Sequence, residues 1–330
     1  MQQTAPWKKR RFFATLLFSL LTIPAWSQPA PAPPGSGSDA KSYTEFGMAN
    51  GAKGNLDAAI EAFDEAIKID PGYAPAYYFR AFAHSQQQKA TEAIADYDHA
   101  IQIDPKYKDA YYQRGCLKGQ SGDFNGAVSD FSEVIKLDPK YAPAYYNSGH
   151  VYYFKGDLDK ALDSLTQALT LDPNSALCYF IRGLIKHAQT QREDASADFQ
   201  KSAGFSFPFA VFWVWITEME NNQQGLAHKE LTDALGKTQL FKPTDWHTQI
   251  GNFLLGKMTQ DDLLAKAQVG EPTQLQERIC EAWFYGGMAK RFAGDMKGSE
   301  DCFRKAIATN AKGSEEFVEA QRQLTDEQNP

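Results

Sequence analysis

A repeat of 34 residues constrains the fold of this 330-residue chain more than any other feature of its sequence. An Asp-Pro pair marks the repeat at constant spacing: Asp70-Pro71, Asp104-Pro105, Asp138-Pro139 and Asp172-Pro173. In the same frame the fourth position is always tyrosine: Tyr43, Tyr77, Tyr111, Tyr145 and Tyr179. Self-similarity at a period of roughly 20 to 50 residues is typical of solenoids and related arrays. The sequence therefore predicts a stack of similar units.

Each unit has the pattern of two antiparallel helices that approach closely. The eighth position is small, the twentieth is alanine, and a large residue fills the twenty-fourth. These three sets are Gly47, Ala81, Gly115, Gly149 and Gly183; Ala59, Ala93, Ala127, Ala161 and Ala195; and Phe63, Tyr97, Phe131, Leu165 and Phe199. Because proline cannot continue a helix, the Asp-Pro pair ends the second helix of each unit. Glycines at Gly54, Gly122 and Gly156 mark the turn between the two helices.

This register resembles the tetratricopeptide repeat (TPR) family, in five units at residues 40–73, 74–107, 108–141, 142–175 and 176–209. The resemblance implies an all-α fold, an α-α superhelix (solenoid) of helical hairpins. One such hairpin is too small to bury its own apolar faces, so neighbouring units must stack.

The register weakens over residues 210–313 without vanishing. Trp213 falls at a fourth position, and second helices are predicted around residues 227–235 and 261–267. Trp283 and Gly287 then restore a nearly regular unit that lacks only the terminal proline. We therefore expect about three divergent hairpins after the five regular units.

Residues 314–330 are predicted to form a capping helix and tail. The segment from Gly313 to Gln328 is polar, as the outer face of a terminal repeat must be for solubility.

The C-terminal part also resembles the NlpI group of periplasmic TPR lipoproteins. The resemblance spans roughly the last 120 residues and rests on Trp246, Ile250, Phe253, Leu255, Gly256 and Leu263, followed by Phe284-Tyr285 and Phe317-Val318-Glu319. That group consists of dimeric adaptors that dock proteases and cell-wall hydrolases in the bacterial envelope. The resemblance implies such partners here and suggests a homodimer. It does not imply a membrane anchor, because the lipid-bearing cysteine is lacking.

The first 27 residues have the pattern of a secretory signal peptide. Four basic residues, Lys8 to Arg11, precede an apolar run from Phe12 to Trp26, and Ala25 and Ser27 provide a small-x-small cleavage site. The run is shorter than the ~20 residues that a spanning helix needs, so we expect cleavage after Ser27. A retained anchor is the alternative.

Residues 28–39 are predicted to be a Pro/Gly/Ser-rich linker between the signal and the folded body. No later stretch is apolar and long enough to span a bilayer, so the mature chain is expected to have no stable membrane anchor. Together with the NlpI resemblance, the signal predicts a periplasmic protein. A secreted protein is the alternative.

Charge excludes nucleic acid as a partner. The chain has 34 Lys and Arg against 41 Asp and Glu, a net charge of −7. The predicted signal peptide contributes four basic residues and no acidic one, so the rest of the chain is more acidic still. Nucleic-acid binding depends on Lys and Arg that neutralise phosphates, and an acidic body does not supply them.

No motif for catalysis, a metal or a cofactor stands out. The four cysteines (Cys116, Cys178, Cys280 and Cys302) have no C-x-x-C spacing, and burial as small apolar residues is favoured over a disulfide. The six histidines form no H-E-x-x-H motif. Residues 251–257 satisfy G-x-x-x-x-G-K, but Met258 cannot bind magnesium and the apolar centre fits a helix. We therefore expect a non-enzymatic chain without catalytic residues, cofactor or metal.

The resemblance places the first helix of each unit on a concave face, where positions five, nine and twelve share one side of the helix. These positions predict a protein-binding site at Tyr78, Phe82, Tyr112, Tyr146, His150, Tyr153, Phe180, Leu184 and His187. Aromatic rings offer a peptide ligand large contact area at low entropic cost. For the fifth-position rings, packing between adjacent units is an equal alternative.

Two further expectations concern charged groups on this face. Arg80, Arg114 and Arg182 recur at the seventh position, where their stems are predicted to cover the neighbouring unit while their charged heads stay in water. A groove for a peptide's terminal carboxylate would need Lys and Asn at positions five, six and nine, and the aromatic residues found there disfavour that ligand.

These observations predict an exported TPR scaffold or adaptor that binds protein or peptide segments in an aromatic concave groove. The alternative is a structural component that associates with itself through the divergent hairpins, which carry Trp213, Trp215, Trp246 and Trp283.

Overall fold

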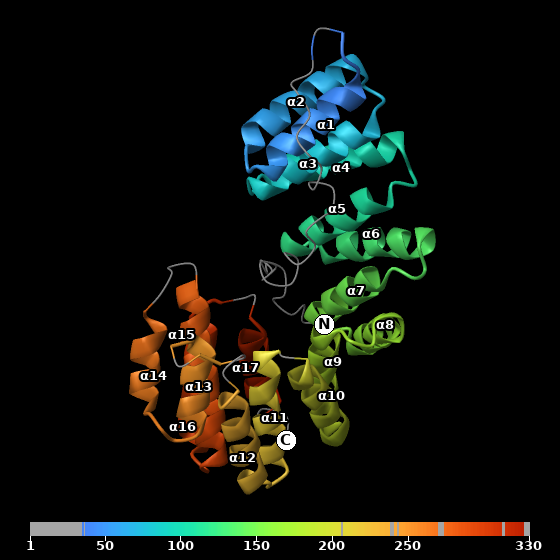
Figure 1. The fold of residues 1–330 in the computed structure, drawn as a ribbon. Coiled ribbons are helices and arrows are strands. Elements are labelled where there is room, and N and C mark those ends of the chain that lie inside the picture. The colour runs from blue at the N-terminus through green and yellow to red at the C-terminus, as the bar shows by residue number, and fades with distance from the viewer. Residues whose placement is uncertain are drawn as a thin grey trace, which may run out of the picture. The chain divides into compact units, whose positions relative to one another are not determined.

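The computed structural model describes residues 35, 37–205, 207–237, 241–242, 244–269, 274–311 and 314–326. This part of the chain contains seventeen α-helices and no strand (Figure 1), which confirms the all-α prediction. The predicted signal peptide and most of the predicted linker lie outside the described residues.

The chain divides into two units, residues 1–157 and 158–330. The described helices of the first unit are α1 (Ala40–Ala52), α2 (Leu56–Ile69), α3 (Ala74–Gln86), α4 (Ala90–Ile103), α5 (Lys108–Gln120), α6 (Phe124–Leu137) and α7 (Ala142–Lys155). Successive pairs are antiparallel and stack one on the next (Figure 1).

The second unit begins with α8 (Leu158–Leu171), α9 (Ala176–Ala188), α10 (Arg192–Gly204), α11 (Pro208–Glu220) and α12 (Gln224–Leu235). It continues with α13 (Trp246–Leu254), α14 (Gln260–Ala267), α15 (Leu275–Phe292), α16 (Met296–Ala308) and α17 (Glu315–Asp326). The three divergent hairpins are thus α11/α12, α13/α14 and α15/α16.

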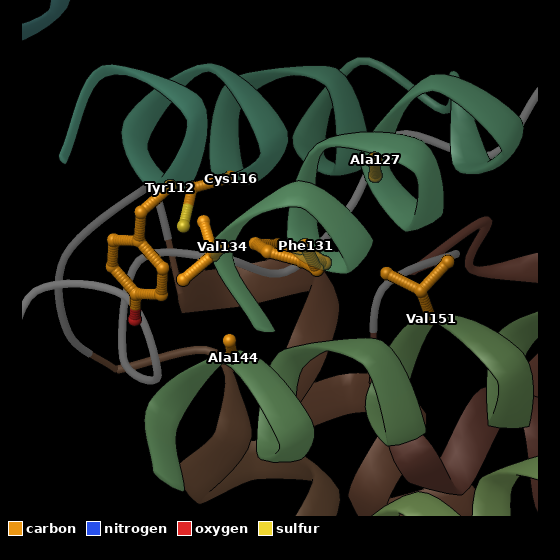
Figure 2. Packing of buried hydrophobic residues seen from close by; sticks show 7 residues of the cluster. All are labelled: Tyr112, Cys116, Ala127, Phe131, Val134, Ala144 and Val151. Atoms are coloured by element: carbon orange, nitrogen blue, oxygen red, sulfur yellow. The ribbon is translucent and has the colours of Figure 1, made fainter. Parts of the chain in front are cut away.

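In the hairpins that begin at Ala40, Lys108 and Ala176, an aromatic ring of the second helix lies against the eighth-position glycine of the first helix. A Cβ atom added to Gly115 would lie 2.9 Å from the Phe131 ring, and one added to Gly183 would lie 2.6 Å from the Phe199 ring. Both rings are fully buried. Figure 2 shows the Phe131 ring among the apolar side chains that join α5, α6 and α7. The small eighth residue is therefore what allows the two helices to close on the ring.

The recurring Asp-Pro pair ends each second helix in the same way. The side-chain Oδ1 of Asp70 accepts a hydrogen bond from the backbone N–H of Gly72 at 2.9 Å, and Asp104 does the same for Lys106. This Asx turn satisfies the backbone where the proline stops the helix. The pair therefore sets the length of each unit.

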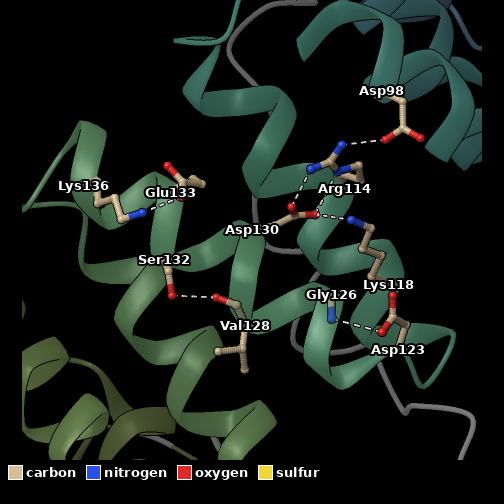
Figure 3. A network of polar contacts seen from close by, with 10 residues as sticks. All are labelled: Asp98, Arg114, Lys118, Asp123, Gly126, Val128, Asp130, Ser132, Glu133 and Lys136. Carbon is tan, nitrogen blue, oxygen red and sulfur yellow. Dashed lines mark hydrogen bonds and ion pairs between the residues drawn. The ribbon is translucent and has the colours of Figure 1, made fainter. Parts of the chain in front are cut away.

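An Arg–Asp network links neighbouring hairpins of the first unit (Figure 3). Arg114 donates two hydrogen bonds to Asp130, at 2.9 and 2.5 Å, and a third to Asp98 of the preceding hairpin at 2.5 Å. Lys118 adds an ion pair to Asp130 at 3.0 Å. The Asp130 side chain is only 3% exposed. Its charge is therefore balanced by two cations inside the stack.

The same arrangement recurs at Arg80 with Asp96 and Asp64, and at Arg182 with Asp198. The expectation that these arginine heads stay in water is wrong. The arginine side chains are mostly buried, and each pairs with a buried carboxylate, that of Asp96, Asp130 or Asp198. A buried charge needs a hydrogen-bonded partner of this kind.

The helix boundaries correct the register of Trp213. Helix α11 begins at Pro208, 32 residues after α9 begins at Ala176, so Trp213 is the sixth helical residue and not the fourth. The eighth is Trp215, where the regular hairpins have glycine or alanine. Trp215 is buried and contacts His228 and Phe292, with ring centroids 6.2 and 5.5 Å away.

Helix α17 closes the described chain, but its polar residues do not all face water. Residues 316–320 are all buried, Glu316 and Glu319 included. Five consecutive residues cover more than one helical turn. Helix α17 is therefore packed on more than one side.

We expect Gly183→Ala to lower the free energy of unfolding by about 1–3 kcal/mol, because the added methyl group meets a buried ring. Urea denaturation followed by circular dichroism measures this. Gly225→Ala is the matched control: it lies in α12, and a Cβ there meets nothing within 4 Å. Equal losses for the two variants would contradict the close-packing explanation.

We expect Arg114→Ser to destabilise the first unit by about 2 kcal/mol or more, because Asp130 keeps a buried charge with Lys118 alone. The double variant Arg114→Ser/Asp130→Ser reproduces Ser148 and Ser164 of the fourth repeat. It should lose less stability than the sum of the two single variants. Strict additivity in the double-mutant cycle would show that the two side chains do not act as a pair.

Candidate functional site

The nine side chains predicted to line the concave face differ in their access to solvent. Six are buried: Tyr78, Tyr112, His150, Tyr153, Phe180 and Leu184. The other three are half-buried: Phe82, Tyr146 and His187. The last three residues of the predicted set, from Phe180 onward, belong to the second unit and the rest to the first.

The fifth-position rings pack between repeats, which is one of the two roles that the sequence leaves open. The Tyr78 ring lies 5.0 Å from Tyr107, and the Tyr112 ring lies 5.3 Å from Tyr141. Tyr107 and Tyr141 each precede the first helix of the next repeat. These rings therefore fix the step from one hairpin to the next.

The polar end of Tyr112 is also held inside the stack. Asn147, which is buried in α7, donates a hydrogen bond to the Tyr112 hydroxyl at 2.8 Å. Burial raises the pKa of the Tyr112 phenol well above its ordinary value. The hydroxyl therefore serves as a structural hydrogen-bond partner between α5 and α7.

His150 is fully buried between rings of its own helix. Its imidazole stacks on Tyr146 at 5.8 Å and meets Phe154 edge-on at 4.8 Å. Burial lowers the pKa of His150 to about 3, so the ring is neutral at physiological pH. In the first unit, Phe82 and Tyr146 are the predicted site residues that are half-buried and not buried.

The second unit contains a polar cavity of about 960 Å³, which we call the α9–α17 cavity. Its charged lining comes from four helices and from the start of α10: His187, Arg192, Glu220, Arg291, Glu319 and Arg322. Of the nine predicted site residues, His187 is the one found in this lining.

On one side of the cavity, Glu220 of α11 interacts with two basic side chains, those of His187 and Arg192. Its Oε2 lies 2.8 Å from His187 Nε2 and 3.5 Å from Arg192 Nε. Burial alone would lower the pKa of His187, but the hydrogen bond to Glu220 and its charge outweigh burial and raise that pKa above its ordinary value. The interaction with Glu220 therefore favours the protonated, cationic form of His187.

Helix α17 forms another side of the α9–α17 cavity. Arg322 pairs with Glu319 within the helix, and Arg291 of α15 donates a hydrogen bond to Gln323. The lining thus combines three arginines and a histidine with two glutamates.

The cavity exists because α15 packs directly against α11. Rings join these two helices along their length: Phe212 with Tyr285 at 5.5 Å, Trp213 with Phe284 at 5.9 Å and Trp215 with Phe292 at 5.5 Å. The repeat pattern does not reveal this site, since Arg192, Arg291 and Arg322 share no repeat position. Packing among α10, α11, α15 and α17 brings them together.

A cluster of carboxylates lies between α15 and α17. Glu281 accepts a hydrogen bond from Trp246 Nε1, and Glu316 accepts one from the Tyr285 hydroxyl at 3.3 Å. Burial, followed by the charges of neighbouring glutamates, raises the pKa of Glu316 well above its ordinary range. Burial and the charge of Glu315 raise the pKa of Glu277 to about 7.

Other candidate chemistry finds no structural counterpart in the described residues. The G-x-x-x-x-G-K segment runs from the end of α13 into a turn at Gly256, and none of the described residues before it forms a strand. No group of His, Cys, Asp and Glu in the described part could hold a metal. The four cysteines are buried and unpaired with one another. None of the described helices is both long and apolar enough to cross a membrane.

The carboxylate cluster predicts that stability falls as pH rises. Burial raises the pKa of Glu316 well above its ordinary range and that of Glu277 to about 7, so the folded state holds protons that the unfolded chain loses near pH 4.5. Unfolding therefore becomes easier as pH rises from about 4.5 to 7, and His187, whose pKa is raised above 6.5, adds to the same trend above that pH. Thermal unfolding followed by circular dichroism should show this slope.

The variant Glu316→Gln should make the slope shallower, because the amide cannot ionise. The exposed Glu300 of α16 provides the control variant Glu300→Gln, which should keep the wild-type slope. An unchanged slope in a folded Glu316→Gln protein would show that the cluster is not its source.

Comparison with known families gives matches over the regular hairpins. A tetratricopeptide repeat family matches residues 142–175, and a second family described as TPR repeat matches residues 52–88, 85–118 and 119–156. No curated protein matches the chain.

Solved structures with similar folds include PilF of Pseudomonas aeruginosa, at 16% identity and a TM-score of 0.53, over 64% of this chain and 95% of PilF. PilW, described as a widely conserved type IV pilus biogenesis factor, is similar at 18% identity and a TM-score of 0.53, over 64% of this chain and 96% of PilW. MamA matches at 25% identity and a TM-score of 0.47, over 48% of this chain and 93% of MamA. The hairpins at residues 52–175 are therefore tetratricopeptide repeats, and they continue into a longer TPR-like solenoid.

Proposed function

We propose that this chain is an exported, non-enzymatic scaffold that binds protein segments on the first-helix face of its repeats. The observation that carries the proposal is the regular stack of TPR hairpins, which places equivalent positions of α3, α5 and α7 on one continuous face. TPR proteins bind protein or peptide partners. A rigid array of this kind needs no moving part to bind an extended segment.

The aromatic positions have two roles in this proposal. The buried rings of Tyr78 and Tyr112 hold the stack in register, so the face is preorganised. Phe82 and Tyr146 are half-buried and supply apolar contact area to a ligand.

Export and the class of partner rest on the sequence. The basic and apolar segments of residues 1–27 support a signal peptide, and the NlpI resemblance supports a periplasmic adaptor for envelope proteases or cell-wall hydrolases. Cell fractionation followed by N-terminal sequencing tests this part. The proposal expects a protein outside the cytoplasm that starts at Gln28.

Self-association through the tryptophans receives less support. Trp213 and Trp215 are buried in the α11–α15 contact, and Trp246 and Trp283 are half-buried. The four rings therefore do not form a broad exposed aromatic surface.

The binding proposal is tested by capturing partners from the native envelope fraction with the mature chain. We expect Phe82→Ala/Tyr146→Ala to lose most of the captured partner, because two of the rings that a ligand can reach are removed. The matched control is Ile69→Ala/Ile103→Ala, which removes exposed apolar side chains from the second helices α2 and α4.

Circular dichroism must show that both variants are folded. A partner that is kept by the control and lost by the ring variant supports the proposal. A partner kept equally by all three proteins would contradict binding on this face, and failure of the wild-type chain to capture any partner would contradict the scaffold role.

A further inference from the structure

We propose that the α9–α17 cavity is a binding site for an acidic peptide segment, which would be held by its side-chain carboxylates. This inference deepens the proposed scaffold function, since it assigns a second surface and a ligand class to the same binding role.

The charge of the lining opposes the charge of the chain. The cavity wall carries three arginines and His187 against two glutamates, whereas the whole chain has a net charge of −7. A local excess of positive charge in an acidic protein concentrates anionic ligands and repels cationic ones.

Arg192 is placed to meet such a ligand. It is the first residue of α10, and its side chain is 51% exposed. Its Nε faces Glu220 at 3.5 Å, which orients the planar guanidinium without covering it. A guanidinium matches a carboxylate with two parallel N–H donors, so a fixed arginine at the rim is suited to this group.

Arg322 lies on the α17 side of the same cavity and is 22% exposed. It pairs with Glu319, which is itself buried. Arg192 and Arg322 come from different helices of one cavity wall, so a ligand with more than one anionic group can meet more than one arginine there.

The size and the uncharged lining favour a peptide over a simple ion. A volume of about 960 Å³ lies near the upper end of the range for ligand pockets. Met219 and Phe292 provide apolar contacts, and Thr190, Asn222 and Gln224 provide polar groups for backbone amides. A segment with alternating acidic and apolar side chains would use both kinds of lining.

The test is fluorescence anisotropy with the whole mature chain and a labelled ten-residue peptide of alternating Glu and Leu, with both ends blocked. Blocked ends ensure that side-chain carboxylates are the only anionic groups. We expect the peptide with Gln in place of Glu to bind at least about tenfold more weakly, and the Glu complex to weaken as salt is raised. A peptide with Lys in place of Glu should not bind.

Two variants locate the site. We expect Arg192→Gln to weaken binding of the Glu peptide about threefold or more, and Arg192→Gln/Arg322→Gln about tenfold or more. Arg304→Gln is the matched control, because Arg304 is an exposed arginine of α16 outside the cavity lining. The single variant keeps the test decisive if the loss of Arg322 beside the buried Glu319 prevents folding.

Equal binding of the Glu and Gln peptides, no binding of the Glu peptide, or unchanged binding by folded Arg192→Gln would each overturn the inference. Its failure can be told apart from failure of the scaffold role. Partner capture that depends on Phe82 and Tyr146 while the peptide does not bind would remove only the cavity assignment.

Discussion

The contact between a small residue of one helix and a ring of the next is the constraint on which the rest of the structure depends. Where the eighth position is glycine, as at Gly115 and Gly183, the ring of Phe131 or Phe199 reaches the backbone and the hairpin closes. Helix α11 has Trp215 at that place, and a side chain of this size cannot lie under a ring in the same way. The Trp215 ring instead contacts Phe292 of α15. The break in the repeat pattern therefore also creates the α11–α15 contact that frames the cavity.

The regular hairpins could be predicted from the sequence because their determinants are local and periodic. The Asp-Pro pair, the eighth-position glycine and the turn glycine each act within one unit, and they place the helices from α1 to α10. The position of Trp213 in its helix could not be predicted by counting in steps of 34 residues. The interval from the start of α9 to the start of α11 shortens to 32 residues, and no local signal marks the change before Pro208. The presence of a helix in this region could be predicted from the sequence, but the repeat position of each of its residues could not.

The candidate sites divide in the same way. Periodicity identified which positions share the face of the first helices. The burial of Tyr78 and Tyr112 depends on Tyr107 and Tyr141, each the last residue of its unit, directly before the first helix of the next repeat. The α9–α17 cavity could not be predicted, because its arginines are joined only by packing between distant helices. The Arg–Asp network is intermediate in how far it could be predicted from the sequence. Arg114 and Asp130 recur in register, and a search for charged pairs 16 residues apart would have found them.

Helix α17 connects two features of the second unit that otherwise have no common element. One part of it places Glu316 among carboxylates whose protonation is stabilised by burial, and another part places Glu319 and Arg322 in the cavity wall. A short helix moves as a unit when its packing loosens. Loss of protons from the carboxylate cluster therefore weakens the support of the same helix that carries Arg322. The carboxylate cluster and the cavity wall thus depend on the packing of one shared helix, α17.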